Sequence, residues 1–133
     1  MKHLEVRHNR QNIKLLQRDI IRIEAYGSYI KIFLTRRRLY VVFHRLQATF
    51  RKLNKNSFFL IHRSHIINID HIKTYPNRQP YSILMFESDP LTIADRRLKP
   101  FSEFLEIYWK QKKARSLKKS LPFNPVFVTL IFK

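Results

Sequence analysis

The sequence contains a single glycine, Gly27, and no cysteine. Without cysteine, the chain has no disulfide framework, no thiolate metal site and no cysteine nucleophile. A Gly-rich phosphate loop or a dinucleotide-binding fingerprint needs several glycines at fixed spacing, and one glycine does not supply them. Nucleotide-binding enzymes of those kinds are therefore not expected.

Acidic residues are also scarce, with 9 Asp and Glu against 27 Lys and Arg, which gives a formal net charge of +18. Such an excess predicts a polyanionic partner, and nucleic acid is the commonest one. Ribosomal RNA and an anionic membrane surface remain open. Residues 1–6 have no apolar signal core, and the longest apolar stretch, 126–132, is far shorter than a membrane span. We expect a cytoplasmic protein that does not insert into a membrane.

Hydrophobic residues make up 44% of the chain and aromatic residues 14%, which is typical of one globular domain with a sizeable core. Apolar and polar residues alternate clearly at 29–35, as in a half-buried strand, whereas helical spacing is present at 46–53 and again from Pro100 onward. The sequence therefore predicts a mostly β fold with a short central helix and a C-terminal amphipathic helix. The expected strands are 3–8, 11–17, 19–25, 29–35, 39–43, 58–61, 66–72, 81–87 and 91–94.

The clearest pattern is two apolar runs, Phe58 to Ile61 and Ile66 to Ile72, separated by the polar residues His62 to His65. This indicates two strands joined by a tight, exposed corner. Arg63 at that corner can hold a phosphate or make a two-pronged contact with guanine. An ordinary polar loop between core strands is the alternative. Ser64 and Asn68 are expected to satisfy backbone groups rather than to bind DNA.

Three motifs in order support a family resemblance. They are IIRIEAYGSYIKI at 20–32, FFLIHRSHIINIDHI at 58–72 and LTIADRRLKPF at 91–101. Together they resemble the LytTR family of bacterial DNA-binding domains over residues 3–105. The resemblance implies small antiparallel β-sheets and loops that read DNA in two successive major grooves, with another loop contact at the minor groove between them.

The resemblance also implies which residues contact DNA. By position in the motifs, the resemblance assigns base reading to the hairpin aromatic, the corner arginine and the paired arginines after the last strand. Neighbouring cations are expected to contact phosphates. The predicted DNA-binding residues are Tyr29, Lys31, His62, Arg63, Arg96, Arg97 and Lys99, supported by the tip at 36–38. Each has an ordinary alternative, either packing on a sheet face or an exposed surface charge.

Two positions depart from the family pattern. Asp95 replaces a Ser that many members have before the paired arginines, and Ser28 replaces an Asn often found next to the hairpin aromatic. A carboxylate at position 95 either repels phosphates or orients Arg97 by a salt bridge. Both departures leave the base preference open.

No catalytic residue, cofactor or metal site is predicted. His62, His65 and His71 have no cysteine and few carboxylates near them in the sequence. A small basic nuclease with two histidines as acid and base is the enzyme alternative, although their spacing does not favour it.

The remaining expectations concern the C-terminal end and the partners. Residues 106–120 are expected to form a basic helical extension and 121–133 an apolar tail, in which 126–132 forms an edge strand, self-associates or binds a regulatory protein. Most members of the family join this domain to a receiver domain, and the resemblance begins near residue 3. If the chain is complete, we expect a stand-alone regulator without a receiver domain, controlled by abundance or by a partner; the alternative is a fragment from which the receiver was removed. The resemblance also implies two copies on repeated half-sites of double-stranded DNA and association with the bacterial nucleoid. A non-specific RNA-binding or architectural protein is the alternative function.

Overall fold

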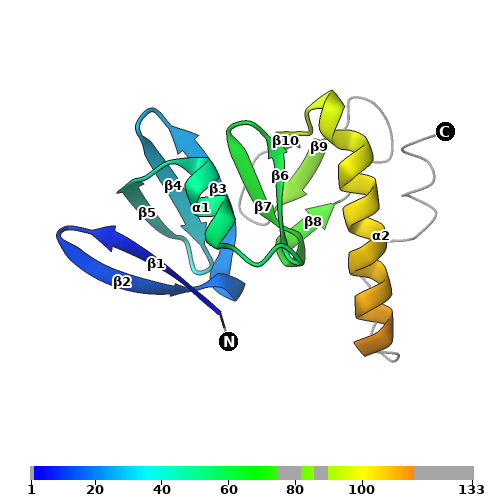
Figure 1. Ribbon diagram of the computed structural model, residues 1–133, viewed down its shortest axis with the longest axis horizontal. Helices are drawn as coiled ribbons and strands as arrows, with labels where there is room; N and C mark the ends of the chain where they lie inside the picture. Colours follow the sequence, from blue (N-terminus) through cyan, green and yellow to red (C-terminus); the bar gives the residue numbers. More distant parts are fainter. Residues whose placement is uncertain (1, 75–81, 86–89, 116–133) are drawn as a thin grey trace. The chain divides into compact units, whose positions relative to one another are not determined.

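The computed structural model describes residues 2–74, 82–85 and 90–115, and the chain divides into two compact units, residues 1–71 and 72–133 (Figure 1). All strand pairs in both units are antiparallel. The predicted fold class, small antiparallel sheets with a short central helix and a C-terminal helix, is confirmed.

The first unit contains a two-stranded and a five-stranded sheet. The two-stranded sheet pairs β1 (His3–His8) with β2 (Gln11–Leu16). The five-stranded sheet has the order β5-β4-β3-β7-β6 and is followed along the chain by the 3-10 turn η2 (Ile69–His71). Its strands are β3 (Ile20–Tyr26), β4 (Tyr29–Leu34), β5 (Arg38–Phe43), β6 (Phe58–His62) and β7 (His65–Asn68). The 3-10 turn η1 (Gln17–Asp19) precedes β3, and helix α1 (Leu46–Lys52) connects β5 to β6.

Strand β4 shows how the sequence pattern forms the core of this unit. Ile30, Ile32 and Leu34 are buried, whereas Tyr29 on the opposite face is exposed, as the alternation predicts. The buried side chains belong to a core cluster that also includes residues of β1, β2 and α1. One face of the five-stranded sheet is therefore apolar, and its strand ends are free to present polar turns.

The second unit consists of a three-stranded sheet and a helix. The sheet has the order β10-β9-β8, and the helix follows the 3-10 turn η3. The elements are β8 (Ile72–Thr74), β9 (Ser82–Met85), β10 (Leu91–Thr92), η3 (Asp95–Arg97) and α2 (Leu98–Arg115). Phe101, Leu105 and Tyr108 are buried along one stripe of α2, which confirms the predicted spacing. The rest of the predicted helical extension and the tail at 121–133 lie outside the described residues.

The predicted strand at 66–72 is divided in the structure. Strand β7 ends at Asn68, and β8 begins at Ile72 in a different sheet. The Asn68 side chain causes this break, because its Oδ1 accepts a hydrogen bond from the Asp70 backbone N–H at 2.9 Å. Its Nδ2 donates to the backbone oxygen of Ile20 at 2.9 Å. The expectation that Asn68 satisfies backbone groups is thus consistent with its contacts.

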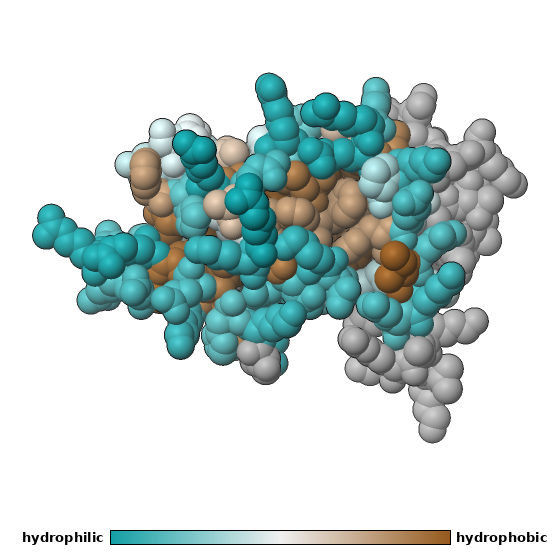
Figure 2. Space-filling view, in the orientation of Figure 1, coloured by the Kyte–Doolittle hydropathy of each residue, from teal (hydrophilic) through white to brown (hydrophobic). Residues whose placement is uncertain are grey.

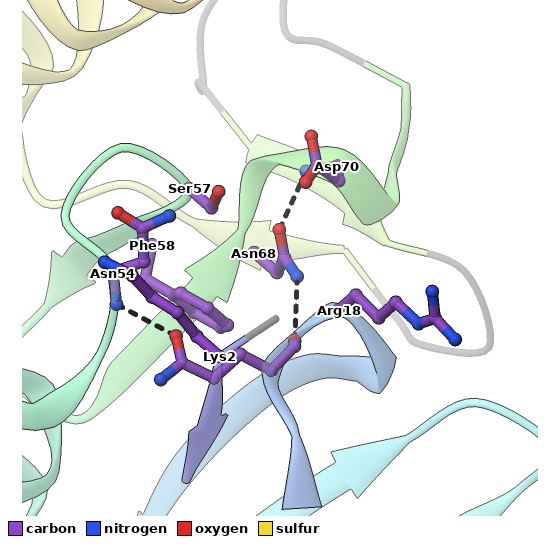
Figure 3. A pocket seen from close by; sticks show the side chains of 8 residues that line it. Lys2, Arg18, Asn54, Ser57, Phe58, Asn68 and Asp70 are labelled. Carbon is purple, nitrogen blue, oxygen red and sulfur yellow. Dashed lines mark hydrogen bonds between the residues drawn. The ribbon is translucent and has the colours of Figure 1, made fainter.

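Asn68 lines a cavity of about 200 Å³ in the first unit (Figure 3). Asn68 Nδ2 also lies 3.4 Å from the Gln17 backbone oxygen, and the Gln17 side chain accepts from the Asn54 backbone N–H at 3.0 Å. Gln17 also donates from Nε2 to the His3 backbone oxygen at 3.0 Å. These buried amides hydrogen-bond to the backbone of several elements, so the cavity is part of the scaffold.

Candidate nucleic-acid interface

The β3–β4 hairpin presents Tyr29 at one end of the five-stranded sheet. Gly27 has a φ of 59°, a left-handed conformation that glycine adopts without strain, and it allows Tyr26 to pair directly with Tyr29. Tyr26 and Tyr29 remain 56% and 46% exposed. Lys31 Nζ lies 4.0 Å from the centre of the Tyr26 ring, so its positive charge is close to the hairpin tip.

The β6–β7 turn presents Arg63. His62 pairs with His65 across the turn, which leaves Arg63 and Ser64 between the two strands, and the Arg63 side chain is exposed. Ser64 donates its backbone N–H to His62 Nδ1 at 3.3 Å, and its Oγ lies 2.9 Å from the same nitrogen. Since a backbone N–H can only donate, His62 Nδ1 is the acceptor, and Nε2 is the nitrogen left to donate to a ligand.

Glu24 on β3 extends this network. The Glu24 carboxylate accepts a hydrogen bond from His65 Nε2 at 3.1 Å and lies 3.9 Å from the Arg22 guanidinium. Burial lowers the pKa of His65, and although Glu24 acts in the opposite direction, Arg22 and His62 lower it further. We therefore treat the His65–Glu24 contact as a hydrogen bond from a neutral imidazole rather than as an ion pair.

These two turns lie at the same end of the sheet (Figure 1). Because β7 pairs with β3, the Ala25 backbone N–H reaches the Ser64 backbone oxygen and donates to it at 2.8 Å. The structure thus brings together the predicted residues Tyr29, Lys31, His62 and Arg63 on one edge of the first unit.

The basic tip at 36–38 lies elsewhere. It joins β4 to β5 at the opposite end of the sheet, away from the β3–β4 turn. Arg38 is tied to the scaffold there, because it donates to the Thr35 backbone oxygen at 3.0 Å and to Asp19 Oδ2 at 3.4 Å. The predicted phosphate contacts from this tip are therefore not part of the edge that presents Tyr29 and Arg63.

The remaining predicted residues lie in the second unit. Arg96 and Arg97 are in η3, where the Arg97 backbone N–H donates to the Ala94 backbone oxygen at 2.8 Å. Arg96 and Asp95 are exposed, Arg97 is half-buried, and Lys99 is exposed in the first turn of α2. Short backbone-bonded turns of this kind can place an arginine outside a sheet without a supporting strand.

The sequence of residues 10–106 matches the family model of the LytTr DNA-binding domain. The chain belongs to the LytTR family. It is therefore a DNA-binding domain of the response-regulator type, which acts in the regulation of transcription. A solved structure of a LytTr DNA-binding domain from Bacillus cereus has a similar fold, with a TM-score of 0.67 and 19% sequence identity. The alignment covers 79% of this chain and 97% of that chain. No match was found among the curated proteins.

Other features of this LytTR domain bear on its chemistry. Within the described ranges, no group of three or more His, Cys, Asp or Glu side chains is arranged to hold a metal ion. Neither helix in the described part of the chain is both long and apolar enough to cross a membrane.

Sequence reasoning missed three residues near Tyr29. Phe43 on β5 pairs with Tyr29, is 75% exposed, and its ring lies 5.6 Å from the Tyr29 ring in an edge-to-face arrangement. Arg45 follows two residues later, and Glu24 lies on the neighbouring strand. For Phe43, the available signal in the sequence was an aromatic residue at the end of the predicted strand 39–43. Glu24 had no signal, because its role depends on the β3–β7 pairing.

Proposed function

We propose that this LytTR domain is a sequence-specific transcription regulator that reads bases through its loops. The observation that supports this most directly is the edge formed by the β3–β4 and β6–β7 turns, joined by the Ala25–Ser64 hydrogen bond of 2.8 Å. Two turns fixed to each other on a rigid sheet hold Tyr29 and Arg63 at a defined spacing, which base reading requires.

The chemistry of these side chains suits DNA. The exposed Arg63 guanidinium can donate two parallel hydrogen bonds to guanine O6 and N7 in the major groove. Lys31 and His62, which flank the two turns, have donors for phosphate oxygens and would fix the position of the domain without reading sequence. In the second unit, the family motif assigns the same base-reading role to Arg96, with Arg97 and Lys99 beside it.

The finer expectations carried over from the family are part of the proposal. Loops would enter successive major grooves, and two copies would occupy repeated half-sites. A regulatory protein or a second copy would bind the stretch 126–132. With about 6 phosphate contacts per copy, log affinity should fall against log salt with a slope of roughly −5.

Non-specific nucleic-acid binding is the second candidate, and the net charge of +18 favours it. It predicts affinity that depends on salt and not on base sequence. Selection of bound duplexes from a random DNA pool, at near-physiological salt, separates the two. Enrichment of a repeated motif supports the specific regulator. A pool that stays random, with binding that only follows the salt concentration, contradicts it.

A further inference from the structure

A recess of about 580 Å³ lies beside Tyr29, between the β3–β4 turn and the start of α1. Its wall includes Ser28, Tyr29, Phe43, His44 and Arg45. In the space-filling view, pale and brown surface near the tip of the β3–β4 hairpin is bordered by teal side chains (Figure 2). We call this feature the Phe43–Arg45 recess.

Two aromatic rings and one cation line the recess, and none of its lining residues is acidic. No Asp or Glu is among its lining residues, whereas Arg45, which is exposed, contributes a permanent positive charge. The Phe43 and Tyr29 rings form an apolar wall, and Ser28 adds a hydroxyl group. A wall of this composition matches a ligand with an anionic group next to an apolar or ring-shaped one.

The backbone of Arg45 is held in place on both sides. Its N–H donates to His44 Nδ1 at 2.9 Å, and its carbonyl oxygen accepts from the backbone N–H and the hydroxyl of the buried Thr49 at 3.0 and 2.9 Å. Burial lowers the pKa of His44 and the charge of Lys52 lowers it further, which keeps the imidazole neutral and able to accept. An arginine with a fixed backbone loses less conformational entropy when it binds a ligand.

We propose that the Phe43–Arg45 recess binds the sugar–phosphate backbone of DNA, with the Arg45 guanidinium on a phosphate and the Phe43 ring against a deoxyribose. Phosphate and sugar contacts of this kind fix a protein's position on the duplex without reading sequence. The proposal rests on the proposed function, because it takes DNA to approach the edge that includes Tyr29. An exposed phenylalanine alone would also suit a protein partner. DNA is favoured because the recess adjoins the edge that includes Tyr29 and because no acidic residue lines it.

The test measures dissociation constants for a selected duplex and for a scrambled duplex between about 50 and 200 mM salt. The R45A variant should bind both duplexes about tenfold more weakly, and its slope of log affinity against log salt should be smaller by about 1. The F43A variant should lose affinity for both duplexes several-fold with an unchanged slope. R51A removes an exposed arginine of α1 that does not line the recess, and it should leave the slope unchanged.

The outcomes separate the recess from the proposed function. If wild type prefers the selected duplex but R45A behaves like R51A, the recess does not bind DNA and the proposed function stands. If wild type binds both duplexes equally, the proposed function fails, and a smaller slope for R45A still supports the recess. If F43A changes the sedimentation coefficient of the free protein and not its DNA affinity, Phe43 is a protein contact and the proposal is wrong for that residue.

Discussion

The two turns that carry the proposed base-reading arginines, Arg63 and Arg96, are built differently. The β6–β7 turn around Arg63 is supported by side chains, since Ser64 contacts His62 and His65 donates to Glu24 on the neighbouring strand. In η3, the cap residue is Ala94, which has no side-chain cap, and a backbone hydrogen bond from Arg97 closes the turn. The support of the Arg63 turn therefore includes side chains of β3, β6 and β7, whereas the hydrogen bond that closes η3 joins two backbone groups.

This difference determines where substitutions should act. Around Arg63, a change in a residue that never touches DNA should alter base discrimination, because the support of the turn is lost. Around Arg96, substitution of the arginine itself should change base discrimination more than substitution of its neighbours.

The largest effect is expected for Asn68, at the far end of the strand that supports Arg63. N68A removes the hydrogen bonds to Ile20 and Asp70 and leaves the backbone oxygen of the buried Ile20 without this partner. We expect the free energy of unfolding to fall by about 3 kcal/mol, measured by urea denaturation. The matched control is N12A, an exposed position on β2, which should change it by less than about 0.5 kcal/mol. Equal effects of the two variants would show that Asn68 has no structural role.

Substitution of Arg96 should affect DNA binding rather than folding. R96A should weaken binding to the selected duplex by about 1–3 kcal/mol, tenfold or more, and relax preference at particular base positions. R96K keeps the charge but not the two-pronged geometry, so it should retain non-specific affinity and lose preference. Fluorescence anisotropy with selected and scrambled duplexes measures both. R96K with wild-type preference would exclude a bidentate base contact.

Two substitutions of Glu24, E24Q and E24A, separate the effect of its charge from its effect on the position of the Arg63 turn. Both E24Q and E24A remove a negative charge and should raise affinity for scrambled DNA. E24Q keeps an acceptor for His65, so the ratio of specific to non-specific affinity should persist, whereas E24A should lower it roughly threefold. Competition binding gives this ratio directly. If E24A and E24Q have the same ratio, Glu24 does not position the Arg63 turn.

The smallest effect is expected for the change in stability at acidic pH. The pKa of His65 is lowered from 6.5 in the folded protein, so the unfolded chain binds a proton more readily at this position. Its contribution to stability is therefore present above about pH 6.5 and is lost as pH falls toward the folded pKa. The groups that face it are Glu24, Arg22 and His62. H65Q retains a donor and removes the titration, so its urea midpoint should fall less than that of wild type between pH 7 and 5. A steeper fall for H65Q would reverse the assigned sign.

Local patterns in the sequence predicted much of the fold, because alternation and helical spacing are properties of neighbouring residues. The buried face of β4 and the stripe at Phe101 and Leu105 are examples. Strand order is not local, and no periodicity indicates that β7 pairs with β3.

The candidate site shows the same limit. Strand alternation alone would place His62 and His65 on opposite faces, yet their pairing across the turn brings the ring centres to 6.3 Å. Glu24 and Arg45 were not predicted, because the residues beside them are distant in the sequence. Glu24 contacts His65 on β7, and Arg45 lines the recess together with Ser28 and Tyr29. The exposed position of Arg63 in a turn was predictable, because it follows from the pattern of the residues next to it.

The most direct measurement compares the base preferences of R63A and R96A, obtained by selection from the same random duplex pool as wild type. If both arginines read bases, each variant blurs a different set of positions within the wild-type motif. If both variants lower affinity equally at every sequence and leave the motif unchanged, neither arginine reads bases.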